Sequence, residues 1–335
     1  AVNDCINFHK AVKEIVLPLV NKIYTYKKQK LNLENYAPYD LDLDVTGLDP
    51  LKPCKNTDEL INKAIVCFTK IDPFFGNCIK TIKEKNQFDL DSRSGKSPGG
   101  YNCPLAVTGV PFIFMNANLQ FSDVVTMLHE GGHAIHSFLC NDLPLQGLKE
   151  YNMEIAEIAS MSMELIALEN GQVFFNDIKT LNRAKLQVLE RAITILPWIA
   201  LIDAFQHWIY ENPTHTVQER EQQWVFLQKQ YSSEILDFTG VEDFIKISWQ
   251  KQLHLFEVPF YYIEYGIAQL GAIAMWKNYL ENPQQTINQY KAALSLGASK
   301  PLPILYKTAG IEFNFSADYI KPIIEFVEKE MIKLQ

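Results

Sequence analysis

One short pattern in the sequence could hold a metal ion, because His129, Glu130 and His133 occur as H-E-x-x-H. In an α-helix, residues four positions apart lie about 40° apart around the axis and about 6 Å along it. Both imidazoles can therefore reach one zinc ion at about 2.0–2.1 Å. Glu130 lies about 100° around the helix from His129. From that position it can take a proton from a water molecule on the metal.

A third protein ligand must come from elsewhere in the chain. The pattern with a third histidine ten positions after the first is excluded, because position 139 is Leu. The segment from Asn152 to Glu169 has a helical period and carries four acids. Two of them lie seven positions apart on one face, so one can be the ligand while the other accepts a hydrogen bond from a ligand imidazole. This pair is Glu157 and Glu164.

The segment from Ser122 to Cys140 is predicted to be the helix that carries the two histidines, with Ser122 as its N-cap. Gly131 and Gly132 follow Glu130 directly. Each glycine costs about 1 kcal/mol relative to Ala inside a helix. We therefore expect something to approach this helix closely.

Residues 88–118 show a different pattern, with glycines and prolines around two apolar runs, Tyr101 to Val107 and Val110 to Met115. These runs predict one small sheet. Pro111 favours an edge position for the second run, where a substrate peptide could add a strand. Nearly everything after this region has a helical pattern. The predicted fold is mainly α, a single domain over residues 1–335 with one small β-sheet beside the active-site helix.

The composition excludes several classes of function. A formal charge of -8 without a long basic run argues against nucleic acid, and the most apolar stretch, from Ala192 to Ile202, is too short to cross a bilayer. Six cysteines without a C-x-x-C pair are typical of free thiols in a reducing compartment. With no signal peptide before Asn3, we expect a cytoplasmic protein. The chain opens with Ala1, so we also expect that upstream sequence is missing.

Several separated motifs resemble the thimet oligopeptidase and oligoendopeptidase F family of zinc peptidases. They are H-E-G-G-H-A-I-H followed by E-I-A-E-I-A-S-M-S-M-E, the upstream G-K-S-P-G-G-Y and P-F-I-F-M-N-A-N, and the downstream H-L-F-E-V-P-F-Y-Y-I-E-Y-G-I-A-Q-L-G-A. They occur in the order of that family, and the likeness extends from Phe8 to the C-terminus. It implies a helical, zincin-like catalytic domain that binds one zinc ion and lacks the family's upstream lobe.

The resemblance also implies roles for particular residues. Glu157 becomes the third metal ligand and Glu130 the general base. His254, with Tyr262 and Tyr265, would bind the substrate carbonyl and its oxyanion, a task suited to placed N–H and O–H donors. Further residues expected around the ligands or the substrate are Glu164, His136 and Tyr261.

The predicted function is a zinc-dependent endopeptidase that hydrolyses short peptides. Two alternatives remain open: a non-catalytic peptide-binding fragment that keeps its zinc site, and a zinc aminopeptidase, which would also use H-E-x-x-H with a downstream glutamate. The intact Glu130 argues against the first alternative. The expected partners are short peptides and a separate N-terminal lobe, with neither nucleic acid nor membrane.

Overall fold

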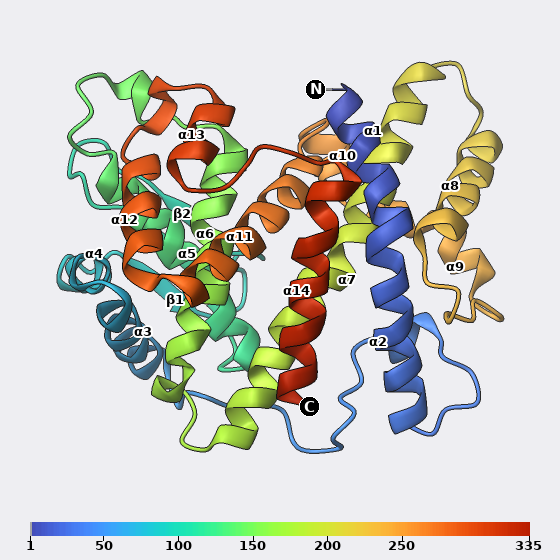
Figure 1. Ribbon diagram of the computed structural model, residues 1–335, viewed down its shortest axis with the longest axis horizontal. Coiled ribbons are helices and arrows are strands. Elements are labelled where there is room, and N and C mark those ends of the chain that lie inside the picture. Colours follow the sequence, from blue (N-terminus) through green and yellow to red (C-terminus); the bar gives the residue numbers. More distant parts are fainter. Residues whose placement is uncertain (1) are drawn as a thin grey trace. The chain divides into compact units, whose positions relative to one another are not determined.

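The computed structural model describes residues 2–335, which are mostly helical and include one three-stranded sheet (Figure 1). This confirms the predicted fold class. The chain divides into two compact units. We call the first, Ala1–Asp49 with Leu189–Ile267 and Asn314–Lys333, the helical unit. The second, Pro50–Val188 with Ala268–Phe313 and Leu334–Gln335, is the sheet unit. The single domain expected from the sequence stays a prediction.

The helical unit begins with α1 (Val2–Ala11), a π-helical turn (Val12–Val16) and α2 (Leu17–Lys30). The π-helical turn ends two residues before Pro18, whose ring has no N–H and crowds the preceding turn. Later elements of this unit are the second part of α7 (Ile178–Glu211), α8 (Val217–Tyr231), α9 (Glu242–Ile247), α10 (His254–Glu257), the start of α11 (Ile263–Glu281) and α14 (Ala317–Leu334).

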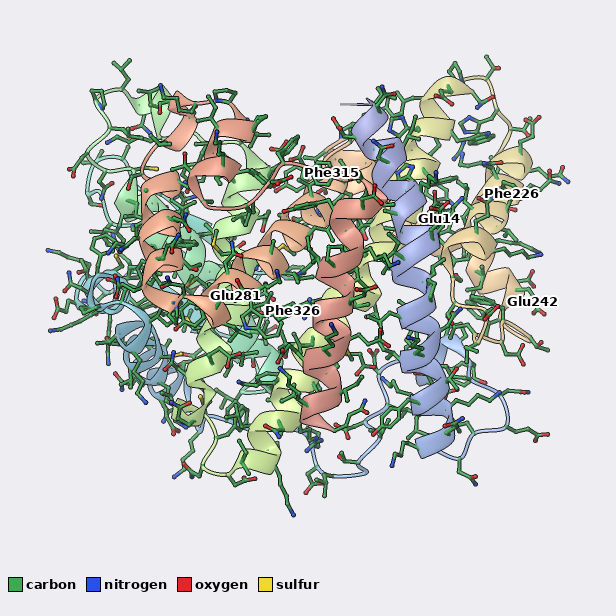
Figure 2. All side chains as sticks on the ribbon, viewed as in Figure 1. Glu14, Phe226, Glu242, Glu281, Phe315 and Phe326 are labelled. Carbon is green, nitrogen blue, oxygen red and sulfur yellow. The ribbon has the colours of Figure 1, made fainter. Side chains whose placement is uncertain are left out.

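Aromatic side chains fill the core of the helical unit. Phe205 on α7 and Trp224 on α8 are fully buried, and their rings meet edge to face with centroids 4.9 Å apart. Phe226, two residues further along α8, is 56% exposed, in contrast to the buried Trp224 (Figure 2). Among residues 2–335, every helix is too short or too polar to cross a membrane.

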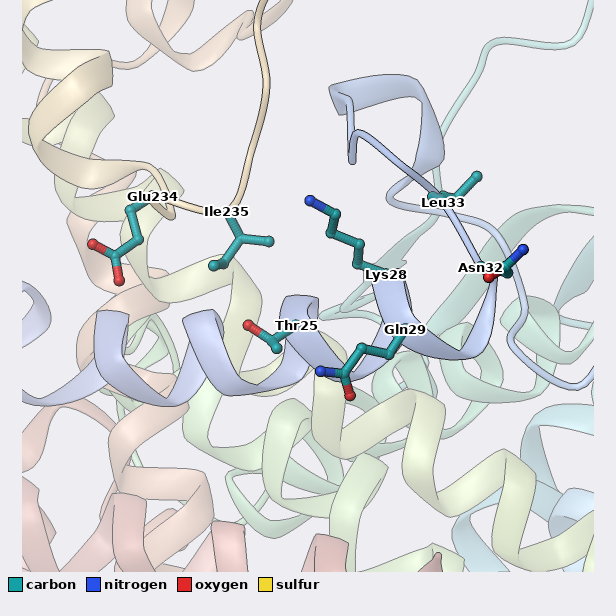
Figure 3. A pocket seen from close by; sticks show the side chains of 7 residues that line it. All are labelled: Thr25, Lys28, Gln29, Asn32, Leu33, Glu234 and Ile235. Carbon is teal, nitrogen blue, oxygen red and sulfur yellow. The ribbon is translucent and has the colours of Figure 1, made fainter.

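The helical unit also contains a polar hollow of about 610 Å³ beside the C-terminal end of α2 (Figure 3). Lys28 and Glu234 contribute opposite charges to its wall. The other lining residues are Thr25, Gln29, Asn32, Leu33 and Ile235. None of the residues predicted to do chemistry lines this hollow.

The sheet unit contains the three strands and the helices packed around them. Its helices are α3 (Thr57–Ile71), α4 (Pro73–Glu84), α5 (Phe121–Leu139), α6 (Met153–Ala167), the first part of α7, the second part of α11, α12 (Pro283–Leu294) and α13 (Leu302–Thr308). Helix α5 packs against α6, and α3 packs against α4. The core of this unit includes Phe68, Phe75 and Ile113, which are fully buried.

The sheet has the order β1-β3-β2, with β1 at Phe88–Asp91, β2 at Tyr101–Cys103 and β3 at Phe112–Ala117. Strand β3 pairs in parallel with β1 and antiparallel with β2. The predicted edge position of Val110 to Met115 is therefore wrong, and so is a peptide strand added there. Pro111 lies just before β3 begins, so it removes no hydrogen bond from the β-ladder. Strand β1 is not among the strands predicted from the sequence.

Helix α5 begins at Phe121, two residues earlier than an N-cap at Ser122 implies. Its N-cap is Gln120, not Ser122, and the cap is closed by Asp123. The Asp123 carboxylate accepts hydrogen bonds from the backbone N–H of Gln120 at 2.8 Å and of Asn118 at 2.9 Å. A carboxylate in the first turn also interacts favourably with the helix dipole. This cap fixes the start of the helix that carries both histidines.

The close approach predicted from Gly131 and Gly132 is present. A Cβ atom at Gly132 would lie 2.5 Å from the carbonyl oxygen of Ala159 and 2.6 Å from the Cα of Ser160, both on α6. A Cβ atom at Gly131 would lie 2.6 Å from the Phe68 ring on α3. The two glycines therefore let α6 and α3 pack directly against the backbone of α5.

We expect Gly132→Ala to lower the free energy of unfolding by about 1–3 kcal/mol, the usual cost of an overpacked core site. The added methyl group meets backbone atoms, which cannot rotate away. The matched control is Gly147→Ala, because that glycine has no atom within 4 Å of the new methyl group. The control should be neutral or slightly stabilising. Urea unfolding of both variants tests this, and equal stabilities would contradict the close-contact argument.

Candidate metal centre

Two histidines of α5 and one glutamate of α6 come together in the sheet unit. Glu157 Oε2 lies 3.3 Å from His129 Nε2 and 3.7 Å from His133 Nε2. Ligand atoms of all three residues lie within 4.8 Å of one another. Two donors at about 2.0–2.1 Å from one zinc ion, at a tetrahedral angle, would lie about 3.3 Å apart. The separations of Glu157 from the two histidines therefore match those of donors that share one zinc ion.

The carboxylate of Glu157 is held in place by its own helix. The hydroxyl of Ser160, three positions later on α6, donates a hydrogen bond to Glu157 Oε2 at 3.0 Å. Glu157 is only 4% exposed. Sequence reasoning did not single out Ser160, although its spacing of three from Glu157 places it on the same face of a helix.

His129 is oriented by a second carboxylate. Its Nδ1 lies 2.6 Å from Glu164 Oε1, which leaves Nε2 directed towards Glu157. A histidine that binds a metal usually donates its other ring N–H to such an acceptor. Of the two acids left open by spacing, Glu157 thus lies where a ligand is needed and Glu164 lies behind the ligand imidazole.

We expect Glu164→Ala to weaken zinc binding by about 10–100-fold, the usual effect of removing the group that orients a ligand histidine. The ion should still bind, because all three ligand side chains remain. Competition with a chromophoric chelator measures the change. Glu154→Ala is the matched control, since Glu154 is an acid of the same helix outside the ligand cluster. An unchanged affinity in Glu164→Ala would show that the Glu164 contact does not orient His129.

Burial and contacts between opposite charges shift the pKa values of the residues at this centre in opposite directions. Burial lowers the pKa of His129, but its contacts with Glu157 and Glu164 raise it more, so the net pKa lies well above the ordinary value. Burial lowers the pKa of His133 to about 4, so its imidazole is neutral near pH 7. Burial raises the pKa of Glu157, yet the two histidines outweigh it and keep the carboxylate ionised. A negative carboxylate beside imidazole nitrogens is a donor set suited to zinc.

Glu130 lies beside the ligands, with 5% of its surface exposed. Burial raises its pKa to about 7, and the negative charges of Glu157 and Glu164 act in the same direction. The positive charge of His129 and a hydrogen bond from the Asn102 backbone on β2 oppose this rise. Its Oε2 is buried and has no hydrogen-bond partner among the described residues. This carboxylate can thus hold or release a proton near neutral pH.

In the metal-free chain, ionised Glu130 should destabilise the fold. Its pKa is about 7 when folded against an ordinary 4.5, so the wild type loses stability relative to Glu130→Gln as the pH rises between these values. The loss should reach about 3 kcal/mol above pH 7 and be absent below about pH 4.5. Denaturant unfolding of the chelator-treated proteins across this range measures it. If the difference in the free energy of unfolding between the two proteins did not vary with pH, the raised pKa of Glu130 would be contradicted.

His136 lies on the same helix but is fully buried. Its ring stacks on Tyr151 with the centroids 3.5 Å apart, and burial lowers its pKa well below the ordinary value. The stacked, buried ring favours packing over contact with a substrate.

The remaining predicted site residues form a second cluster, in the helical unit. The His254 ring lies 5.0 Å from that of Tyr262 and 5.7 Å from those of Tyr261 and Tyr265. The Gln252 amide donates to His254 Nδ1 at 2.7 Å, so the proton of the neutral ring is on Nε2. That N–H is 3.4 Å from the Tyr265 hydroxyl. These residues assemble a group of N–H and O–H donors within one unit.

Two histidines on an H-E-x-x-H helix, a carboxylate from the next helix and a buried glutamate beside them are an arrangement typical of metallopeptidases. The model of Peptidase family M3 matches residues 1–323, and the chain belongs to this family.

Among proteins similar to this chain is the oligoendopeptidase F homolog of Borreliella burgdorferi, with 26% identity over 90% of this chain and 51% of the relative. Another is oligopeptidase PepF of Bacillus subtilis, 22% identical over 95% of this chain and 47% of the relative. The chain thus spans about half the length of these relatives. The solved structure of Pz peptidase A with an inhibitor superposes with a TM-score of 0.92 and 27% identity, over 99% of this chain and 58% of that one.

Proposed function

We propose that the chain is the catalytic part of a zinc-dependent endopeptidase that hydrolyses short peptides. The observation that carries the proposal is the set of His129, His133 and Glu157 within 4.8 Å of one another, with Glu130 buried beside them. Membership of the M3 family and the oligopeptidase names of its relatives support peptides as substrates. Cytoplasmic localisation is proposed from the absence of a C-x-x-C pair and from low cysteine use.

His129, His133 and Glu157 would hold the zinc ion, which when bound polarises a carbonyl and makes water more acidic. Glu130 accepts the proton of the attacking water on the free Oε2 and later delivers it to the leaving amine. Glu164 keeps His129 in the tautomer that presents Nε2. We assign oxyanion binding to the His254 N–H and a tyrosine hydroxyl of the second cluster, Tyr265 or Tyr262, because such donors stabilise developing negative charge.

The test combines zinc content with cleavage of an internally quenched peptide that is blocked at both ends. We expect cleavage at an internal bond and the loss of activity when a chelator removes zinc. Cleavage of only the peptide with a free N-terminus would instead indicate an aminopeptidase. Bound zinc without cleavage of either peptide would favour a peptide-binding module. Because the chain spans about half of its relatives, the assay is run with this chain alone and with an upstream lobe added in trans.

A further inference from the structure

Another group of side chains that could bind a metal ion lies in the helical unit, apart from the candidate metal centre and from the His254 cluster. Cys5 on α1 and Asp203 and His207 on α7 offer a thiol, a carboxylate and an imidazole within 4.8 Å of one another. Asp203 and His207 are four positions apart on α7, so they share one face of that helix. His9 is four positions after Cys5 on α1 and faces the same carboxylate. Two facing helices thus each supply an i, i+4 pair.

Asp203 lies at the middle of this cluster and is 1% exposed. Its Oδ2 is 2.8 Å from His9 Nε2 and 3.5 Å from His207 Nε2. A buried carboxylate is costly unless it is paired or binds a metal. The shorter distance is a hydrogen bond from His9, whereas the 3.5 Å separation is longer than a strong hydrogen bond. His9 therefore orients the Asp203 carboxylate, whereas His207 lies beside this carboxylate without a strong hydrogen bond to it.

The separation of His207 Nε2 from Asp203 Oδ2 is typical of two atoms that bind the same metal ion. Donors on one tetrahedral zinc ion would lie about 3.3 Å apart, and the corresponding separations in the candidate metal centre are 3.3 and 3.7 Å. The 3.5 Å between Asp203 Oδ2 and His207 Nε2 falls between them. This pair thus repeats the ligand spacing of the first centre, and the Cys5 thiol lies within 4.8 Å of both donors.

The surroundings allow an ion to enter. Cys5 is partly exposed and His207 retains 28% side-chain exposure, while Asp203 is enclosed. Aromatic rings flank the two histidines, with Tyr231 6.1 Å from His9 and Phe260 5.1 Å from His207. These rings limit the access of solvent to the cluster, as the hydrophobic shell of a metal site does.

We propose that Cys5, Asp203 and His207 form a second zinc site, with His9 as the residue that positions the Asp203 carboxylate. A thiolate, an imidazole and a carboxylate suit zinc, whereas magnesium and calcium prefer oxygen donors. Three protein ligands leave one coordination position for water or a small ligand. The site is independent of the His129 centre and does not rest on peptidase activity.

Cobalt substitution gives the sharpest test, because only the proposed second site contains a cysteine. We expect Co²⁺ to produce a thiolate-to-cobalt charge-transfer band in the near ultraviolet that persists in Glu157→Ala and disappears in Cys5→Ser. Cys103→Ser is the matched control, since Cys103 is the exposed cysteine and belongs to neither cluster. Loss of the band in Cys103→Ser, or no band in the wild type, would overturn the proposal.

Metal content provides the second measurement. The wild type loaded with Zn²⁺ and dialysed should hold about two ions per chain. Glu157→Ala and Cys5→Ser should each hold about one, and the double variant close to none. His9→Ala should keep the band but bind Zn²⁺ about 10–100-fold more weakly at this site. Circular dichroism confirms that each variant is folded. A folded Cys5→Ser chain that retains the full zinc content of the wild type would refute the site, leaving Asp203 as a carboxylate paired only with histidines.

Discussion

Replacing Glu130 with Gln is expected to lower kcat/KM for a blocked peptide by about 10²–10⁴-fold, the usual contribution of a general base. The amide has nearly the same shape as the carboxylate but cannot accept the proton of the attacking water. The zinc content should not change, because Glu130 is not among the three clustered ligands. Steady-state kinetics with metal analysis of the same preparation tests both halves of this expectation.

Glu164→Gln is the matched control for this experiment, since it also converts a carboxylate near His129 to an amide. Its effect should appear as weaker zinc binding and be relieved by added zinc, whereas added zinc should not restore Glu130→Gln. Near-normal turnover in the zinc-loaded Glu130→Gln protein would rule out Glu130 as the general base. Another group would then have to accept the proton of the attacking water.

Glu157→Ala should produce the largest loss of metal from the His129 centre. The change removes one of three ligands and the buried negative charge that faces both imidazoles. Loss of a residue that only orients a ligand weakens zinc binding by up to about 100-fold. We expect Glu157→Ala to weaken it more than that, and peptidase activity should fall with it. Isothermal titration of the metal-free protein with Zn²⁺ measures the loss, with the Cys5→Ser background used to isolate this centre.

Glu154→Ala provides the comparison, because it removes an acid one turn earlier on α6 without touching the ligand cluster. Its zinc affinity should equal that of the parent. If instead Glu154→Ala lost the ion and Glu157→Ala kept it, the third ligand would be Glu154 and the arrangement of the α6 side chains would have to differ from the one described.

The sequence places His129 and His133 beside an acid of α6 because the patterns behind this prediction are local. The spacing of His129 and His133 fixes their geometry on a helix, and the seven-residue spacing of Glu157 and Glu164 places both acids on one face. Spacing alone left open which acid lies nearer the imidazoles. That choice depends on how α6 packs against α5, which is decided by the contact at Gly132.

The sheet shows where local patterns were insufficient. Strand β1 has only four residues, and its partner β3 lies more than twenty positions away in the sequence, so no short-range pattern marks the pairing. Pro111 favours an edge position only for a strand that contains it, and it lies outside β3, which is the central strand. The Cys5, Asp203 and His207 cluster was missed for a similar reason, since about 200 residues separate Cys5 from the other two.

The backbone contact between α5 and α6 at Gly132 also bears on how the ion enters and leaves. Small zinc domains that fold only around their metal must order the chain at each binding event. Here the spacing of the two ligand helices is set by packed backbone and by buried neighbours, so the ligands remain near their positions whether or not an ion is bound. Loss of zinc should thus be a local and reversible event, and an inactive chain stripped of metal can be reloaded without refolding.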